Sequence, residues 1–230
     1  MNEDRYLAEA RSGKLVNVVW SAATRDNERN LLPVRIPLGK GILGYRIALI
    51  HKDNQHMLGQ IKSLDDLRKY SFGLGRGWGD VPIYQKAGIP IVTANYESLF
   101  KMLASKRFHI FSRGINEVFL EYDEFNAELP AIAIEQNLLL HYPYPFYFFV
   151  SPSEPLLAAR IEKGLRFMLK DGSFDRIFEK YNGHAIKLAR LAQRQIIEIP
   201  NPELPEAPPL NDPELWFRPN SRPLAGTDLH

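Results

Sequence analysis

A run of glycines that alternate with larger residues is the first feature of this chain with the means to bind a ligand. It reads GLGRGWG over residues 73–79 and lies where an expected strand gives way to an expected helix. Bare backbone amides at such a turn, beside a helix N-terminus, can hold an anion. We therefore expect ligand contacts at Arg76, Gly77 and Trp78, where the indole can also cover an apolar part of the ligand. The alternative interpretation is a tight turn that needs glycine for backbone reasons alone.

The same stretch does not match the motifs of nucleotide-binding proteins. A dinucleotide fingerprint that starts at Gly73 requires glycine at the position of Trp78, and the chain has no glycine-lysine-serine phosphate loop. The six histidines show no metal-ligand spacing. Cysteine is absent, which excludes disulfides, thiolate metal sites and a cysteine nucleophile. The sequence predicts no cofactor and no metal.

The overall composition is that of a folded globular protein with a balanced charge. The chain has 230 residues, 45% of them hydrophobic, which is enough for one or two domains. Its formal net charge of +2, from 29 basic and 27 acidic residues, gives no reason to expect a nucleic acid or an acidic membrane surface as partner. We expect no membrane insertion and find neither a long apolar run nor a basic-then-apolar leader.

Expected strands and helices alternate along most of the chain, which predicts mostly parallel sheets flanked by helices. The expected strands are residues 15–20, 35–38, 45–50, 71–74, 90–94, 108–111, 131–139 and a short one from Tyr147. Residues 200–223 differ, because they hold eight of the seventeen prolines and favour extended structure. We expect this segment to lie along the surface, pinned by Trp216 and Phe217.

Two stretches carry a resemblance to a known family. YFFVSPSEPLLAARIEKGLRFMLKDGSFDRIFEKYNG, residues 147–183, has a strand, a capping segment, a helix, an Asp-Gly-Ser break and a second helix that Gly183 is expected to end. SLDDLRKYSFGLGRGWGD, residues 63–80, opens with a capping box. In this order they closely resemble bacterial extracellular solute-binding proteins of family 3, the periplasmic amino-acid type of ABC transporter substrate-binding protein. The resemblance covers about residues 13–200.

The resemblance implies a two-lobed α/β fold of the type 2 periplasmic-binding kind. One lobe is expected to comprise residues 1–50 and 146–199 and the other residues 51–145, followed by a proline-rich tail over residues 200–230. The chain is expected to cross between lobes near residues 51–54 and 142–146. Members of the family usually have a further strand, helix and strand before the segment that matches residues 15–20, so we expect a truncated or reduced first lobe.

The resemblance also implies where a ligand carboxylate would bind. In the family, a threonine followed closely by an arginine lies after the strand of the first lobe, and the arginine binds the carboxylate through a forked salt bridge. Thr24 and Arg29 are the expected counterparts, with Arg25 as an alternative because the spacing is looser than usual. Guanidinium suits this role, since it is always charged and binds carboxylate bidentately. The alternative interpretation is that Arg25 and Arg29 are both solvent-exposed side chains of a loop with no role in binding.

Arg113 marks a departure from the family. Amino-acid binders usually carry an aspartate here that pairs with the ligand's amino group, whereas this chain has no carboxylate until Glu117. A cleft arginine at this point disfavours an ammonium and favours an anion, unless Glu117 takes over the amine. The alternative is a surface charge. Trp20 and Tyr45 lie at strand ends or hinges where cleft aromatic residues are common, although packing in the core is their simpler role.

The leading hypothesis is a binding module that closes around a small polar or anionic solute, an amino acid or a related carboxylate. Its expected partners are the ligand and the membrane subunits of an ABC transporter, and its expected location is the periplasm. A second hypothesis is a dehydratase-like enzyme on the same scaffold, with Glu117 and His109 as general acid or base. A third is a truncated homologue that binds nothing.

Overall fold

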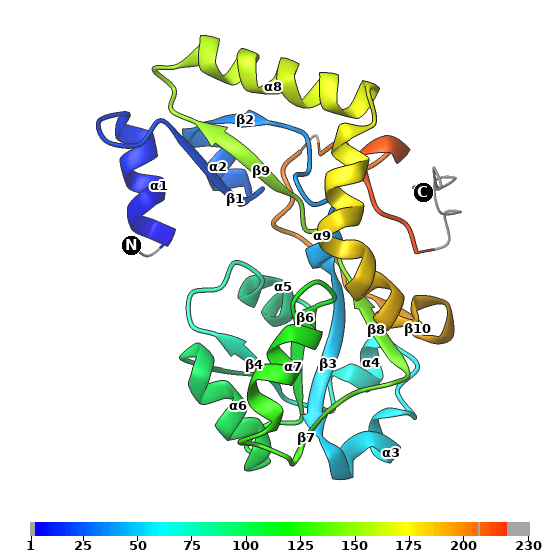
Figure 1. Cartoon of the computed structure of the whole chain (residues 1–230). Helices are drawn as coiled ribbons and strands as arrows, with labels where there is room; N and C mark the ends of the chain where they lie inside the picture. Colours follow the sequence, from blue (N-terminus) through cyan, green and yellow to red (C-terminus); the bar gives the residue numbers. More distant parts are fainter. Residues whose placement is uncertain (1–2, 207, 220–230) are drawn as a thin grey trace.

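The chain folds into two α/β lobes, one above the other in Figure 1. The computed structural model describes residues 3–206 and 208–219. A three-stranded sheet lies in the upper, small lobe, and a seven-stranded sheet lies in the lower, large lobe. Helices flank both sheets, so the expected two-lobed α/β fold is confirmed.

The small lobe is built around one strand that runs against its two neighbours. The strand order is β1-β9-β2, and β9 is antiparallel to both of the others. Its elements are α1 (Glu3–Ser12), β1 (Val18–Ala22), α2 (Arg25–Asn30), β2 (Leu32–Val34), β9 (Phe146–Val150) and α8 (Pro155–Lys170). Leu7 of α1 packs with Phe149 on one side of the sheet, and Leu165 of α8 packs with Val150 on the other. The small sheet is thus a separate layer with its own core.

The large lobe has the strand order β10-β8-β3-β6-β4-β5, with β7 paired to β3. Its strands are β3 (Tyr45–His51), β4 (Phe72–Gly75), β5 (Ile91–Ala94), β6 (Ile110–Gly114), β7 (Ile132–Ile134), β8 (Leu138–His141) and β10 (Gln195–Glu198). Its helices are α3 (Gln55–Leu58), α4 (Leu64–Leu67), α5 (Val81–Lys86), α6 (Tyr96–Ala104) and α7 (Val118–Asn126). All of the strands except β3 share one direction, as expected for a mostly parallel sheet.

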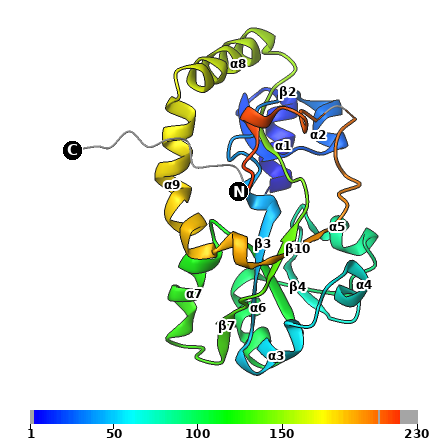
Figure 2. The ribbon, with the colours of Figure 1, turned by 90° about the vertical axis from the view of Figure 1, so that its right-hand side faces the viewer.

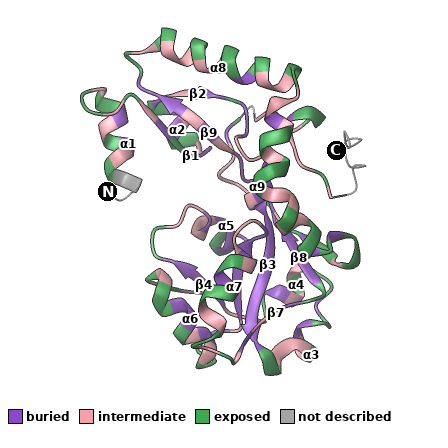
Figure 3. Ribbon diagram, in the orientation of Figure 1, coloured by how far each residue is buried: buried purple, intermediate pink, exposed green. Residues whose placement is uncertain are grey.

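The strand β3 belongs to the large lobe, so the change of sheet comes earlier than residues 51–54. Residues 35–38, expected as a strand, are part of the connection between β2 and β3. Every residue of β3 is buried, because it lies between neighbouring strands with helices on both faces (Figure 3). The return connection follows β8, and the two connections touch: a Cβ on Gly44 would lie 2.1 Å from the carbonyl oxygen of Tyr142.

The helix α9 (Ser173–Ala189) crosses from one lobe to the other. It starts after Gly172, whose φ of +74° is the expected left-handed stop. The prediction that Gly183 ends this helix was wrong, since the helix continues for another turn and a half. Phe174 packs in the core of the small lobe, whereas Ala189 is buried in the core of the large lobe. The prediction that the Lys and Arg residues of 187–194 form a solvated face holds for Lys187 and Arg190, which are exposed, and fails for Arg194, which donates to the carbonyl of Glu135 in the large lobe.

Two local expectations failed, the first of them because a buried side chain redirects the backbone. Residues 131–139 form two strands, β7 and β8, because the fully buried carboxylate of Glu135 accepts the backbone N–H groups of Asn137 and Leu138 and makes a turn. At α8, neither serine caps the helix: Pro155 occupies the first turn, and Ser151 is bonded to Ser153 instead. The capping box at Ser63 is present, since its Oγ accepts the N–H of Asp66.

The segment after β10 leaves the large lobe and runs beside α5 and α2 to the small lobe (Figure 2). We call residues 199–206 and 208–217 the C-terminal strap. The indole N–H of Trp216 donates to the carbonyl of Pro209, and the ring of Phe217 packs on Phe178 of α9. The expectation that these two aromatic residues pin the segment is confirmed. Within the described part of the chain, no helix has the length and apolar character needed to span a bilayer.

Candidate functional site

The candidate site lies where two parallel strands of the large sheet end. β4 and β6 are neighbours in parallel register, so their carboxyl ends meet at one edge of the sheet. In open α/β sheets, ligands bind at this edge. The glycine-rich loop follows β4, and Arg113 stands near the end of β6. A Cβ on Gly79 of the loop would lie 3.8 Å from the Cβ of Ala22, so this edge meets the small lobe.

Arg113 is an internal ion-pair partner and not a free cation. Its Nε and Nη2 each donate to the carboxylate of Glu121 at 2.6 Å, in the bidentate geometry typical of strong pairs. Its guanidinium carbon lies 4.5 Å from the centre of the Trp78 ring. Only 7% of the Arg113 side chain is exposed. Trp78 and Arg113 are the two sequence-predicted site residues that the structure brings together.

A second buried pair, Arg46 with Asp80, lies next to the first. Arg46 Nη2 donates to Asp80 Oδ2 at 2.7 Å, and the hydroxyl of Tyr142 donates to the same oxygen at 2.9 Å. Burial by itself disfavours the charge of Arg46, but Tyr142 and Asp80 outweigh it and hold the pKa of Arg46 well above its usual value. Asp80 Oδ1 and Arg46 Nε are buried without a hydrogen-bond partner among the described residues.

Glu117 lies between the two ion pairs and contacts an arginine of each. It is the most exposed of the five charged side chains in this network. Its Oε2 accepts the N–H of Gly114 at 3.0 Å and lies 3.1 Å from Arg113 Nη2 and 3.8 Å from Arg46 Nη1. The Glu117 side chain is 31% exposed. Counted together, this network has two guanidinium groups and three carboxylates, those of Asp80, Glu117 and Glu121. The inference that Arg113 favours an anionic ligand therefore does not hold, because its charge is already neutralised.

The glycine-rich loop presents an open backbone beside this network. Gly77 is exposed with a φ of +79°, a left-handed conformation that favours glycine, and a Cβ there would meet nothing within 4 Å. Arg76 is exposed and Trp78 is half-buried. The loop thus leaves the backbone at Gly77 accessible to a ligand, whereas the Trp78 ring packs on Arg113 and is only partly exposed.

The ligand-binding residues expected in the small lobe, all of them within the described part of the chain, form no side-chain hydrogen bond or ion pair with one another. Trp20 is 59% exposed and its ring lies 5.5 Å from that of Phe146. The hydroxyl of Thr24 accepts the N–H of Asn27 and so caps α2. Arg29 is exposed at the end of that helix and makes no hydrogen bond or ion pair with the described residues. Arg25, the alternative, donates to the carbonyl of Leu204 in the C-terminal strap.

Tyr45 packs behind the site. It is 8% exposed, stacks on His141, and donates its hydroxyl to the carbonyl of Phe217 at 3.1 Å. Tyr45 therefore packs in the core, which is the simpler of its two expected roles, and does not face a cleft. Burial raises the pKa of its hydroxyl to about 12, with Glu198 as the second cause.

This shift predicts a weakening of the fold in alkali. Tyrosine in an unfolded chain has a pKa of about 10, so the folded state keeps the Tyr45 proton longer than the unfolded state. The stability from Tyr45 is fully present below about pH 10 and is lost as the pH rises toward about 12. Tyr45→Phe should therefore lose less stability than the wild type across this range, measured by urea unfolding at a series of alkaline pH values. Equal pH slopes would contradict this assignment, and Tyr181→Phe, at a 73% exposed site, is the control.

The two residues proposed for an enzyme are separated by a strand. His109 precedes β6, where its Nδ1 lies 2.9 Å from Ser71 Oγ, whereas Glu117 follows the other end of β6. These two groups do not form an acid–base pair. Among the described residues, no group of three or more histidine, aspartate or glutamate side chains is arranged to hold a metal ion.

Sequence reasoning missed most of the buried network. Arg46 interrupts the otherwise apolar run YRIALI, and this lone charge was the available signal. Glu117 and Glu121 follow Arg113 at helical spacing, which places them on one side of α7. Nothing local in the sequence marks Asp80 as the partner of Arg46.

The comparisons with known proteins agree with this architecture. Neither a protein-family model nor a curated protein matches the sequence. The fold is that of the two-lobed substrate-binding proteins of ABC transporters that handle amino acids, as the sequence resemblance indicated.

Three solved structures show the extent of the similarity. An ancestral arginine-binding protein bound to glutamine is 25% identical to this chain. The match covers 80% of this chain and 78% of that protein, with a TM-score of 0.58. An ABC transporter binding component from Wolinella succinogenes complexed with lysine is 14% identical, with coverages of 79% and 76% and a TM-score of 0.58. An ancestral amino-acid-binding protein, described as a precursor of cyclohexadienyl dehydratase, is 20% identical, with coverages of 76% and 72% and a TM-score of 0.53.

Proposed function

We propose that this chain binds a small polar solute between its two lobes, as the substrate-binding component of a transport or sensing system. The observation that carries the proposal is Glu117: a partly exposed carboxylate close to the half-buried Trp78, at the edge of the large sheet that meets the small lobe. Ala22, which meets this edge, shares a face of β1 with the exposed Trp20. A solute held here would contact groups from both lobes.

The charge balance favours a solute with a cationic group. The carboxylates of the network outnumber its guanidinium groups by one, and Glu117 is the member nearest to solvent. An ammonium or guanidinium group would gain an ion pair with Glu117 at this partly exposed position. Within the class of amino acids and related carboxylates, we infer that an amino acid is preferred over a dicarboxylate. Arg29 and Thr24 stay as proposed contacts for the ligand carboxylate.

The proposal includes a location and a partner. Several of the similar structures are described as ABC transporter substrate-binding components. By this analogy the chain would act in the periplasm and deliver its solute to the membrane subunits of a transporter. We propose binding without catalysis, and the separation of His109 from Glu117 supports this choice.

A thermal-shift panel tests the proposal. L-arginine, L-lysine, L-glutamine, L-glutamate and succinate are each added to the purified chain, and the melting temperature is recorded. A ligand present at about 100 times its Kd stabilises the folded state by about 2.7 kcal/mol, which should raise the Tm by roughly 5–10 °C. Glu117→Gln should remove the rise caused by the amino acids, while Glu128→Gln, an exposed carboxylate at the far end of α7, should keep it.

Four results would contradict the proposal. A full amino-acid response in Glu117→Gln would remove Glu117 from the site. A response to succinate alone would reverse the preferred ligand class. Consumption of the ligand during incubation, followed by NMR, would favour the dehydratase-like enzyme, and no response to any compound would favour a homologue that binds nothing.

A further inference from the structure

The C-terminal strap has one end in the core of each lobe. Ile199, just after β10, is 1% exposed in the core of the large lobe. Leu215 is 5% exposed in the core of the small lobe, where it packs with Val34 and Val150. The residues between these anchors span the boundary between the lobes (Figure 2).

The middle of the strap binds both lobes within a few residues. Asn201 Nδ2 donates to the carbonyl of Pro143, in the connection between β8 and β9, at 2.8 Å. Glu203 forms an ion pair with Lys86 of α5 in the large lobe. The carbonyl of the next residue, Leu204, accepts Arg25 Nε of α2 in the small lobe at 3.1 Å.

The end of the strap closes over the other connection. A Cβ on Gly41, whose φ is +70°, would lie 2.4 Å from the Trp216 ring, so the indole packs directly on this glycine. The N–H of Phe217 donates to the carbonyl of Lys40 at 2.8 Å. The Phe217 ring also lies 5.4 Å from that of Tyr45, at the start of β3. Both connections between the sheets therefore contact the strap.

We propose that the C-terminal strap restrains the hinge between the lobes and sets the angle at which they rest. A hinge closes when a few connecting residues change their backbone angles while both lobes stay rigid. Here the strap joins the lobes in addition to the two connections and to α9, and its six prolines make it a stiff spacer that resists shortening and bending. Any change in the angle between the lobes must bend the strap or detach one of its ends.

The distance between the lobes, measured in the full chain without ligand, tests this restraint. Because the chain has no cysteine, Leu156→Cys on α8 and Leu120→Cys on α7 accept spin labels at defined positions. Both sites are well exposed, at 85% and 73%, so the labels disturb no packing. Double electron–electron resonance then reports the distribution of distances between the two lobes.

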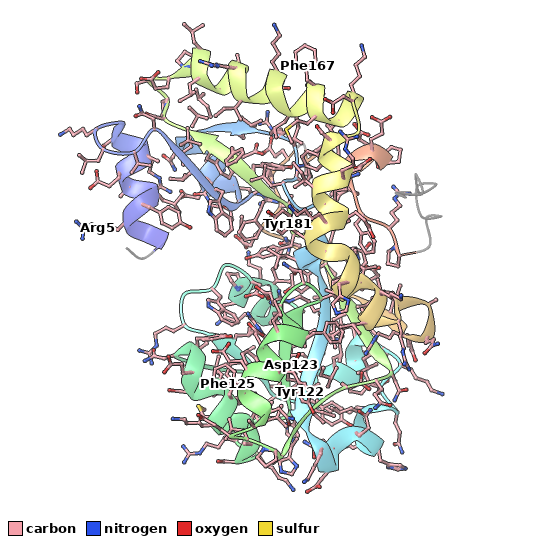
Figure 4. The ribbon with its side chains drawn as sticks, viewed as in Figure 1. Arg5, Tyr122, Asp123, Phe125, Phe167 and Tyr181 are labelled. Carbon is pink, nitrogen blue, oxygen red and sulfur yellow. The ribbon has the colours of Figure 1, made fainter. Side chains whose placement is uncertain are left out.

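Two strap variants are compared with a matched control. Trp216→Ala/Phe217→Ala releases the end of the strap, and Arg25→Ala/Lys86→Ala cuts the polar contacts of its middle. Phe167→Ala is the control, because Phe167 is 57% exposed on the outer side of α8, away from the strap (Figure 4). We expect a broader distribution with a shifted mean in both strap variants and the parent distribution in the control.

The proposal is overturned if the strap variants keep the parent distribution. If Trp216→Ala/Phe217→Ala fails to fold, as judged by circular dichroism, the result with Arg25→Ala/Lys86→Ala decides alone. Lys86 and Arg25 are exposed, so their removal leaves both cores intact. The measurement needs no ligand, so it is independent of the solute-binding proposal.

Discussion

Arg46→Met is expected to lower the free energy of unfolding by about 3–5 kcal/mol, because it leaves a carboxylate buried without its counter-ion. Asp80 is 2% exposed, and among the described residues it keeps only the hydroxyl of Tyr142 as a side-chain partner once Arg46 is removed. Methionine approximates the volume of the arginine stem, so the loss comes from the charge and not from a cavity. Urea unfolding at neutral pH, followed by circular dichroism, measures the change.

Two further variants separate this cause from a general loss of packing. Arg46→Met/Asp80→Asn removes both charges and should recover most of the lost stability, since a buried pair is worth little more than well-packed neutral groups. Arg166→Met breaks the pair with Glu162 on α8, where the two side chains are 62% and 43% exposed. It should cost at most about 1 kcal/mol. A loss for Arg46→Met no larger than that for Arg166→Met would contradict the role of the buried pair.

Arg113→Met should show a similar loss of about 3–5 kcal/mol, because it leaves Glu121 without its bidentate partner. The Glu121 side chain is 11% exposed, and its remaining hydrogen-bond partner is the hydroxyl of Tyr96, at 2.9 Å. The stacking of the guanidinium on Trp78 would also be lost. Arg113→Met/Glu121→Gln should recover most of the stability in the same urea assay.

This prediction distinguishes the two interpretations of Arg113. The sequence alone suggested a ligand contact, whereas the structure makes Arg113 the counter-ion of Glu121. If Arg113→Met kept the stability of the parent but lost its response to ligand, the guanidinium would be a ligand contact after all. A loss of stability that Glu121→Gln reverses would support the structural role.

The elements themselves followed from local patterns. The strands expected at residues 45–50, 71–74 and 90–94 lie within one residue of the bounds of β3, β4 and β5, because apolar runs and the residues that end them are local features. The left-handed stop at Gly172 was visible for the same reason. The end of α9 was not, since Gly183 is tolerated inside a helix that continues until Ala189 packs in the core of the large lobe.

The assignment of strands to sheets did not follow from local patterns. β3 is apolar apart from Arg46 and His51, which indicates a buried strand but not the sheet that buries it. Its pairing with β6 and β8 joins segments that lie far apart in the sequence. β10 was missed because its burial depends on β8 and on the return of the chain after α9.

The sequence by itself determined most of the order of helices and strands, the α/β class and the resemblance to solute-binding proteins, because these features reside in short-range periodicity and in motifs. Only the tertiary structure decided which charges neutralise one another. Arg46 and Asp80 are separated by 34 positions, and their pairing depends on how β3 packs beside the loop after β4. The C-terminal strap has the same physical cause: its contacts join residues that no local pattern relates, and they form only when both lobes are folded.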